Sequence, residues 1–370
     1  MRKLAVLVIL LAIALGIVAL LPRQAAPPPG TASLTVYCAA NLKKPVEAIA
    51  ERYRTETSVE VKLQFGGTGT LLANLRAAQQ GDLFITADQA GIDDGKKFGV
   101  IGEVIPLITQ RPVIAVRAGN PKGIKTLADL RRDDVKFALV NPEAAAIGRV
   151  VKKKLGADYE PLAVRAAVQK PTVTEIASDL SLGSVDAAII WDSTVPQFKG
   201  IEAVEVPEIS THVEKASVGV LAFSKQLPAA LRFARYLAAP EKGGEIFKQN
   251  GFTPIPGDKW ADKPEMVLYS GGVNRPAIEG LLREFADREG VSVTTVFNGC
   301  GVLCASMKAM NDATDPKFPD AYYACDLCFV PPVAQQFPQS VMLTHTDIGI
   351  VVKKGNPRGV KTLADLAQPG

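Results

Sequence analysis

Apolar and polar positions in the first 250 residues follow a strand-like pattern and a helix-like pattern in turn. Residues 34–37 form an apolar run typical of a buried strand, and residues 59–65 alternate in polarity as a second strand would. Between them, Pro45 occupies the first turn of a predicted helix. The apolar residues of this helix recur at i, i+3, i+4 and i+7 and would share one face: Val46, Ile49, Ala50 and Tyr53. This order of elements predicts a mainly parallel sheet with helices on both faces.

The same alternation continues to about residue 250 and suggests two lobes. Further strands are predicted at 82–86, 112–117, 137–140, 187–191 and 217–223, with helices near 144–155, 173–182 and 228–238. If the strand at 112–117 carries the chain into a second lobe and the strand at 217–223 returns it, the chain crosses between the lobes twice. The predicted fold class is α/β, with two lobes, two crossing strands and a cleft that could close on a ligand.

A duplicated segment indicates a partial second copy of this fold. Gly119–Leu130 (GNPKGIKTLADL) recurs as Gly355–Leu366 (GNPRGVKTLADL), and ten of the twelve positions are identical. Three earlier landmarks match as well: Tyr37 to Pro45 with Tyr269 to Pro276 after one deletion, Thr68 with Cys300, and Asp82 with Asp326. Residues 348–353 would repeat the first crossing strand. We therefore expect an incomplete second domain that holds lobe one only and cannot close around a ligand.

The origin of this half-copy allows two hypotheses. It could be a truncated or split product of a longer two-domain protein, because the sequence breaks off within a repeated motif. Alternatively, it could pair with another chain through its open sheet edge.

An unbroken apolar run, residues 4–21, follows Arg2 and Lys3 at the start of the chain. As a helix it would be roughly 27 Å long, close to the thickness of the hydrocarbon layer of a membrane. We expect an uncleaved anchor, with a cleaved signal peptide as the alternative; either one exports the rest of the chain to the periplasm or another extracytoplasmic space. The expected organisation is an anchor and Pro-rich spacer (1–30), a complete two-lobed domain (31–262) and the incomplete domain (263–370).

Composition and charge exclude several classes of function. The formal net charge of +4 is small and no long basic run occurs, which argues against a nucleic-acid partner. The chain has only two histidines, so His-based metal sites and Ser-His-Asp catalysis are not expected. No cofactor and no enzymatic activity are predicted.

Four of the five cysteines lie in the second copy: Cys300, Cys304, Cys325 and Cys328. Their spacing, C-x3-C followed by C-x2-C, resembles that of a four-cysteine zinc site. In an exported chain, however, disulfides are more usual than structural zinc. Free thiols, one or two disulfides, and a metal site therefore stay open, and we predict no metal ligand among them.

Two loops rich in small polar residues precede helices and could bind an anion: 39–41 and 66–70 (GGTGT). Helix N-termini present free N–H groups, and glycine lets the backbone approach a ligand closely. Neither loop contains a cation, which favours a compact, fully ionised oxyanion bound by dipoles and hydrogen bonds. The alternative is an ordinary turn and an ordinary helix cap.

Ordered motifs from residue 34 to about residue 251 resemble the periplasmic molybdate-binding proteins of ABC importers. They are AANL, FGGTGTL, GDLFITADQ, VNPEAAAIG, VDAAIIW and EIFKQNGFTPI. The resemblance implies the two-lobed periplasmic binding protein fold, which closes on one molybdate or tungstate through neutral hydrogen bonds. It also implies a partner, the ABC permease in the membrane.

The same resemblance implies five ligand-binding positions. They are Asn41 and Thr68 through their side chains, Ile147 and Val173 through their backbone N–H groups, and Trp191 in place of the family's usual tyrosine donor. Asp192, next to Trp191, would repel an anion if it pointed into the cleft, or could accept the proton of a bound phosphate. Phosphate and sulfate are therefore alternative ligands. A membrane-tethered sensor or interaction module is the alternative from another functional class.

Overall fold

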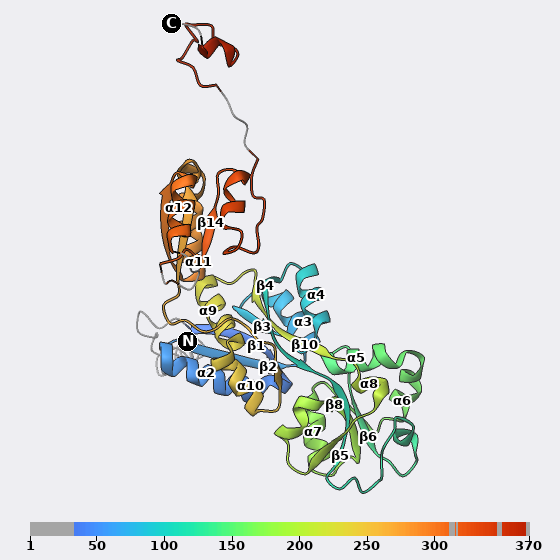
Figure 1. Ribbon diagram of the computed structural model, residues 1–370. Coiled ribbons are helices and arrows are strands. Elements are labelled where there is room, and N and C mark those ends of the chain that lie inside the picture. The colour runs from blue at the N-terminus through green and yellow to red at the C-terminus, as the bar shows by residue number, and fades with distance from the viewer. Residues whose placement is uncertain (1–32, 311–314, 316, 346–349, 368–370) are drawn as a thin grey trace, which may run out of the picture. The chain divides into compact units, whose positions relative to one another are not determined.

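The computed structural model describes residues 33–310, 315, 317–345 and 350–367, which form two compact units (Figure 1). The first unit covers residues up to Pro264 together with Phe285–Val291, and the second covers Glu265–Glu284 and the residues from Ser292 on. The apolar run at residues 4–21, our expected anchor, lies outside the described residues. Among those that are described, no helix is long and apolar enough to cross a membrane.

Lobe one of the first unit is built on a six-stranded sheet in the order β11-β4-β10-β3-β1-β2. The strands are β1 (Ser33–Ala39), β2 (Glu60–Gly66), β3 (Leu83–Ile85), β4 (Ile101–Gln110), β10 (Glu214–Leu221) and β11 (Thr253–Pro254). The pairs β1–β2 and β1–β3 are parallel, whereas β10 runs antiparallel to both β3 and β4. The helices of this lobe are α2 (Lys43–Thr57), α3 (Thr68–Ala78), α4 (Gln89–Lys97), α9 (Leu227–Ala238) and α10 (Glu245–Gln249).

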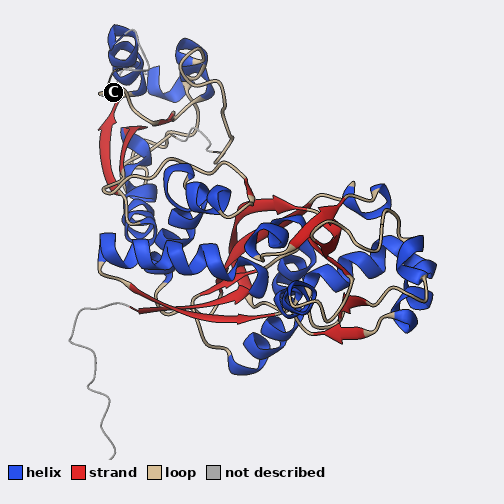
Figure 2. Cartoon of the chain, turned by 90° about the horizontal axis from the view of Figure 1, so that it is seen from below, coloured by secondary structure: helices blue, strands red, loops and turns tan. Residues whose placement is uncertain are grey.

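Lobe two is built on a five-stranded sheet in the order β7-β6-β8-β5-β9. Its strands are β5 (Pro112–Arg117), β6 (Phe137–Val140), β7 (Val168–Lys170), β8 (Ala187–Trp191) and β9 (Ile201–Val204). Its helices are α5 (Ala146–Leu155), α6 (Tyr159–Arg165), α7 (Val173–Ser181) and α8 (Pro207–Ser210). Helices flank the strands in both lobes (Figure 2). The strand at 112–117 does enter lobe two, and β10 returns the chain to lobe one, so the predicted two-lobed α/β fold is confirmed. The prediction of a mainly parallel sheet was wrong, because both sheets are mixed: β10 and β11 in lobe one and β5 and β9 in lobe two form antiparallel pairs.

The predicted apolar face of α2 forms part of the core of lobe one. Val46 and Ile49 are fully buried, and Tyr53 is 2% exposed. The ring of Tyr53 lies 4.8 Å from that of Phe233 and 4.9 Å from that of Tyr236, measured between ring centroids; both partners belong to α9. Aromatic pairs of this kind contribute about 0.5–1.5 kcal/mol beyond their buried area. These aromatic contacts hold α2, and with it the loop before α2, against α9.

The second unit repeats the first three strands of lobe one. Its sheet has the order β13-β12-β14, as in β2-β1-β3, with β12 (Glu265–Gly271), β13 (Ser292–Asn298) and β14 (Ala321–Tyr323). Helices α11 (Arg275–Glu289) and α12 (Cys300–Met310) have the same lengths as α2 and α3. The strand registers also agree, because Ser33 pairs with Glu60 and Glu265 pairs with Ser292, both with parallel neighbours.

This register corrects two of the matches that the sequence suggested. No residue is deleted after Tyr269, because the spacing from strand to helix is the same in both units; Pro276 therefore occupies the position of Lys44 rather than that of Pro45. The equivalent of Asp82 is Asp320, not Asp326. The side chain of Asp320 accepts a hydrogen bond from Val267 N at 2.7 Å, just as Asp82 accepts one from Thr35 N at 2.8 Å.

The second copy of the GNP motif has the same turn as the first, although the residues described before it do not form a strand. Asn120 and Asn356 both have a positive φ, 42° and 43°. Each side chain bridges the backbone four residues later, at Ile124 and Val360. The strand predicted just before the second motif was wrong as far as the structure describes it, because residues 350–353 are not in a strand. The strand of the first unit that this segment was predicted to repeat is β5, which pairs with β8 and β9. The described part of the second unit contains no equivalents of these, so the backbone has no ladder to join.

Candidate functional site

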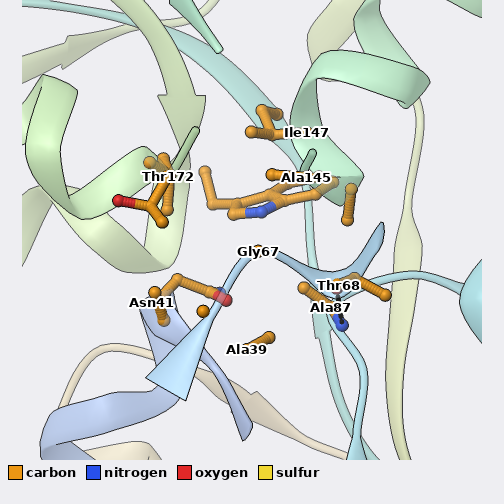
Figure 3. A pocket seen from close by; sticks show the side chains of 13 residues that line it. Ala39, Asn41, Gly67, Thr68, Ala87, Ala145, Ile147 and Thr172 are labelled. Atoms are coloured by element: carbon orange, nitrogen blue, oxygen red, sulfur yellow. Dashed lines mark hydrogen bonds between the residues drawn. The ribbon is translucent and has the colours of Figure 1, made fainter. Parts of the chain in front are cut away.

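A pocket between the two lobes of the first unit holds about 230 Å³ of space, part of it open to solvent (Figure 3). Thirteen residues line it: Ala39, Ala40, Asn41, Gly66, Gly67, Thr68, Ala87, Ala145, Ala146, Ile147, Thr172, Val173 and Trp191. All five predicted ligand-binding residues belong to this set, although their role as ligand donors stays a prediction. Among the described residues, no charged side chain lines the pocket.

Three helices begin at the pocket, and their first N–H groups have no acceptor within their own helix. They are α3 at Thr68, α5 at Ala146 and α7 at Val173. In α7 a capping box, in which Thr172 and Glu175 each accept from the other's backbone N–H, satisfies the flanking groups. The N–H of Val173 is left without a partner in the described part of the chain. Converging helix N-termini give the pocket a positive potential without a positive side chain.

The glycines of the GGTGT loop let lobe one approach lobe two closely. The N–H groups of Gly69 and Thr70 donate to Ala144 O, at 3.0 and 3.3 Å. A Cβ at Gly67 would lie 2.3 Å from Ala144 O, and a Cβ at Gly69 would lie 2.3 Å from Glu143 O. Any other residue would force the lobes apart. The loop therefore makes the contact between the lobes, and the N–H groups of Gly69 and Thr70 already have an acceptor there. Its anion-binding role stays a prediction.

The hydroxyl of Thr68 is positioned to donate into the pocket. Its side chain is 1% exposed, and Oγ1 accepts a hydrogen bond from Ala87 N at 3.3 Å. Because a hydroxyl both donates and accepts, the O–H stays available for a ligand. Asn41 is similarly buried and uses one amide N–H to donate to Gln110 Oε1 at 2.9 Å. Its second N–H remains available.

Trp191 lies at the end of β8 and is 1% exposed. In the described part of the chain its indole N–H has no hydrogen-bond partner, and the residue lines the pocket. An indole has one donor and no acceptor, so it can serve only a ligand that accepts hydrogen bonds.

Asp192 belongs to the wall behind the pocket and does not line it, as far as the described residues show. Its Oδ1 accepts from Arg111 N at 3.0 Å and from Ser193 N at 2.7 Å, and its other oxygen faces Arg111 Nε at 3.7 Å. Burial raises the pKa of this carboxyl, while these two backbone N–H groups act in the opposite direction. The oxygens of Asp192 therefore contact Arg111 and Ser193, and the side chain is not among those that line the pocket.

Gln110, at the end of β4, holds the two lobes together beneath the pocket and was missed from sequence. It is 2% exposed; its Oε1 accepts from Asn41 and from Ser193 Oγ, each at 2.9 Å, and its Nε2 donates to Ala87 O at 2.9 Å. Gln197 adds a second link, donating to Asn41 O and to Ser193 O. One signal for this role was present in the sequence: Gln110 is an amide residue within the otherwise largely apolar stretch from β4 to β5.

An ion pair also joins the lobes outside the pocket. Arg149 of α5 meets Asp88, the N-cap of α4, through Nε to Oδ2 at 3.0 Å and Nη2 to Oδ1 at 3.3 Å. Asp88 is fully buried, and burial raises its pKa to about 6 although the positive charge of Arg149 lowers it. The carboxylate thus carries a desolvation cost that one arginine offsets only in part.

The second unit has different chemistry at the equivalent positions. Cys300 takes the place of Thr68, Val273 that of Asn41 and Cys325 that of Ala87. The described residues supply no second lobe to face them. They also contain no group of three or more His, Cys, Asp or Glu side chains that could hold a metal ion, so the zinc alternative has no support there.

The sequence was compared with known protein families and with known proteins. The sequence model of a family described as bacterial extracellular solute-binding protein matches residues 34–253 and 266–370. The molybdate-binding protein ModA of Mycobacterium tuberculosis is 27% identical over 233 residues, which cover 62% of this chain and 87% of that protein. ModA of Escherichia coli is 27% identical over 231 residues, covering 60% and 88%.

A solved structure shows a similar fold. The periplasmic molybdate-binding protein of Azotobacter vinelandii superposes with a TM-score of 0.52 at 17% identity, covering 60% of this chain and all of that one. At that identity the likeness concerns the fold alone.

Proposed function

Because this chain belongs to the family of bacterial extracellular solute-binding proteins, we propose that it captures molybdate or tungstate outside the cytoplasm and delivers it to an ABC permease. It is an extracytoplasmic oxyanion-binding protein of the importer type and not an enzyme. The identity of the oxyanion is the part that we infer.

The neutral pocket with converging donors is the observation that carries this proposal. Thr68, Asn41 and Trp191 offer side-chain donors, and the starts of α5 and α7 offer backbone N–H groups. Molybdate, tungstate and sulfate are doubly charged tetrahedral ions that carry no proton near neutral pH and can accept hydrogen bonds on all four oxygens. Such an ion matches a site that is made of donors.

The hydrogen bonds of the Asp192 carboxylate argue against phosphate as the ligand. Phosphate retains a proton near neutral pH, so its site needs an acceptor. The nearest candidate from sequence, Asp192, accepts from Arg111 and Ser193 instead. Sulfate has the charge and the acceptor pattern of molybdate and is smaller, so it remains the competing ligand. Two relatives that bear the name molybdate-binding protein, each 27% identical, favour molybdate over sulfate.

We also propose that residues 4–21 hold the protein at the membrane, on the strength of their unbroken apolar run after Arg2 and Lys3. Membrane fractionation tests this proposal: the protein should sediment with membranes and resist extraction by high salt. Recovery in the soluble periplasmic fraction with residues 1–21 removed would show a cleaved signal peptide instead.

A thermal-shift titration tests the ligand assignment. Molybdate, tungstate, sulfate and phosphate are each added to the purified chain, and the melting of the first unit is followed. A ligand at about a hundred times its dissociation constant adds about 2.7 kcal/mol of apparent stability. We expect shifts with molybdate and tungstate and none with phosphate. A shift with sulfate alone, or with phosphate, would contradict the assignment.

A further inference from the structure

Two cysteines of the second unit replace a hydrogen-bonded pair of the first. Thr68 Oγ1 accepts from Ala87 N at 3.3 Å in the first unit. At the equivalent place in the second unit, Cys300 Sγ accepts from Cys325 N at 3.2 Å. Cys300 begins α12, and Cys325 follows β14 two residues after its end. The second unit therefore keeps the hydrogen bond between the first residue of the helix and the segment after the third strand. In the second unit both residues of this contact are cysteines.

The two side chains face each other across Gly271, the last residue of β12. A Cβ built on Gly271 would lie 2.8 Å from Cys300 Sγ and 2.9 Å from Cys325 Cβ. The sulfur of one residue and the Cβ of the other thus border the same small space, which only glycine leaves open. In a disulfide the Cβ atoms lie about 3.5–4.5 Å apart. The contact of Cys325 N with Cys300 Sγ at 3.2 Å and the shared space at Gly271 bring the two residues close, and rotation about χ1 turns each sulfur toward the other.

The other cysteines of this unit have different partners. Cys304 Sγ is buried and lies 3.5 Å from the Tyr322 hydroxyl and 3.4 Å from Phe329 O, to which it donates. Cys328 is exposed, and its backbone N–H donates to Asp326 at 2.9 Å. Cys300 and Cys325 are thus the pair that the fold brings together.

We propose that Cys300 and Cys325 form a disulfide when the exported protein is oxidised, pinning the start of α12 to the end of β14. The oxidant is a disulfide donor, either a small-molecule disulfide or a disulfide oxidoreductase. The thiolate of the exposed Cys325 attacks the donor disulfide, forming a mixed disulfide and releasing one donor thiol. Cys300 then attacks Cys325 Sγ and releases the second donor thiol. The two cysteine thiols lose two hydrogens, and the donor gains them.

The acidity of Cys325 governs the rate of this step. Burial, with a hydrogen bond to the Cys300 thiol, raises the pKa of Cys325 to about 11. Little thiolate is present at neutral pH, so uncatalysed crosslinking by a small disulfide is expected to accelerate nearly tenfold for each pH unit between 7 and 9.

The crosslink would stabilise a small sheet, one edge of which has no further strand in the described residues. In lobe one, β10 covers the edge of β3. The described part of the second unit has no strand on the corresponding edge of β14. Cys300 and Cys325 are 25 residues apart, and closing a loop of this size restricts the unfolded chain substantially. A disulfide would also occupy the place where the Thr68 hydroxyl sits in the first unit.

Peptide mapping tests the pairing. The full chain is treated with oxidised glutathione, free thiols are alkylated under denaturing conditions, and the unreduced digest is analysed by tandem mass spectrometry. We expect one crosslink, Cys300 to Cys325, with Cys38, Cys304 and Cys328 alkylated. Cys328→Ser should keep the crosslink. A crosslink from Cys325 to Cys328, or five alkylated cysteines, would overturn the proposal.

Cys300→Thr supplies a matched control for stability. Threonine at this position can accept from Cys325 N, as Thr68 accepts from Ala87 N in the first unit, but it cannot form a crosslink. Reducing agent should lower the melting temperature of the second unit in the oxidised wild type and leave Cys300→Thr unchanged. An equal shift in both proteins, or no shift in either, would contradict the proposal.

Discussion

The hydroxyl of Thr68 illustrates the recognition by neutral groups that we propose for this pocket. Its oxygen accepts a hydrogen bond from Ala87 N, and its O–H can donate to a ligand. Asn41 is held in the same way by Gln110. Each donor is oriented by a buried partner before any ligand arrives, which reduces the conformational cost of binding.

Thr68→Val removes the donor while keeping the shape of the side chain. A hydrogen bond to a charged partner contributes about 1.5–3 kcal/mol, so affinity for molybdate should fall about 10- to 100-fold. Thr68→Ser retains the hydroxyl and should bind within a few-fold of wild type. Isothermal titration calorimetry distinguishes them. Equal affinity of the valine variant and wild type would exclude a role for this hydroxyl.

Trp191→Phe removes the indole N–H but keeps an aromatic ring in the buried wall. We expect molybdate affinity to fall about tenfold, because one donor to the anion is lost. Trp260→Phe is the matched control, because the indole of Trp260 donates to Asp262 at 2.7 Å and does not line the pocket. Calorimetry on both variants tests the assignment, and unchanged binding by Trp191→Phe would refute it.

The charge of Asp88 predicts a pH effect. Its pKa in the folded protein is about 6, above the ordinary 3.8, so the folded state binds a proton more readily than the unfolded state. The resulting cost to stability is present above pH 6 and disappears as pH falls toward 4. Asp88→Asn avoids this cost. Its free energy of unfolding relative to wild type should therefore rise by roughly 2 kcal/mol between pH 4 and pH 7.

Denaturant unfolding of the two proteins at several pH values measures this difference. A difference that does not change with pH would show that the Asp88 carboxyl titrates alike in the folded and unfolded states.

At the scale of elements, the sequence predicts strands best where apolar runs are bounded sharply. The strands at 112–117, 137–140 and 187–191 have the predicted bounds. The match between Asp82 and Asp326 was wrong because the loop before β14 is six residues longer than the loop before β3, counted from Met310 to Asp320 and from Ala78 to Asp82. A short strand such as β14 carries too little pattern to reveal that shift.

The five pocket positions could be predicted because the ordered motifs around them resemble those of the periplasmic molybdate-binding proteins, and all five line the pocket. The network of Gln110 could not, since its partners come from η1 (Ala40–Leu42), the loop after β3, and η4 (Asp192–Gln197). These segments are far apart in sequence, and a single buried amide gives no periodic signal.

Gln110→Leu tests how β4 supports the pocket. The substitution leaves Ala87 O, the Asn41 amide and the Ser193 hydroxyl without their buried partner, which should destabilise the first unit by about 2–3 kcal/mol. Gln64→Leu, on an exposed position of β2, is the control and should change stability by less than about 0.5 kcal/mol. Similar unfolding midpoints for both variants would contradict the role given to Gln110.

At the scale of the whole molecule, the described residues of the second unit repeat the first three strands of lobe one, with different side chains at the pocket positions. Because Val273 and Cys300 replace Asn41 and Thr68, the second unit lacks the side-chain donors of the first. Calorimetry on the full chain should therefore give one molybdate per chain, and a stoichiometry of two would show that the second unit binds as well.

Crystals grown with tungstate test the central claim most directly, since tungsten can be located by its anomalous scattering. We expect one tungsten per chain, in the pocket between the lobes, within hydrogen-bonding reach of Thr68 and Trp191 through its oxygens. Tungsten bound elsewhere, or a pocket that stays empty at saturating tungstate, would contradict the account.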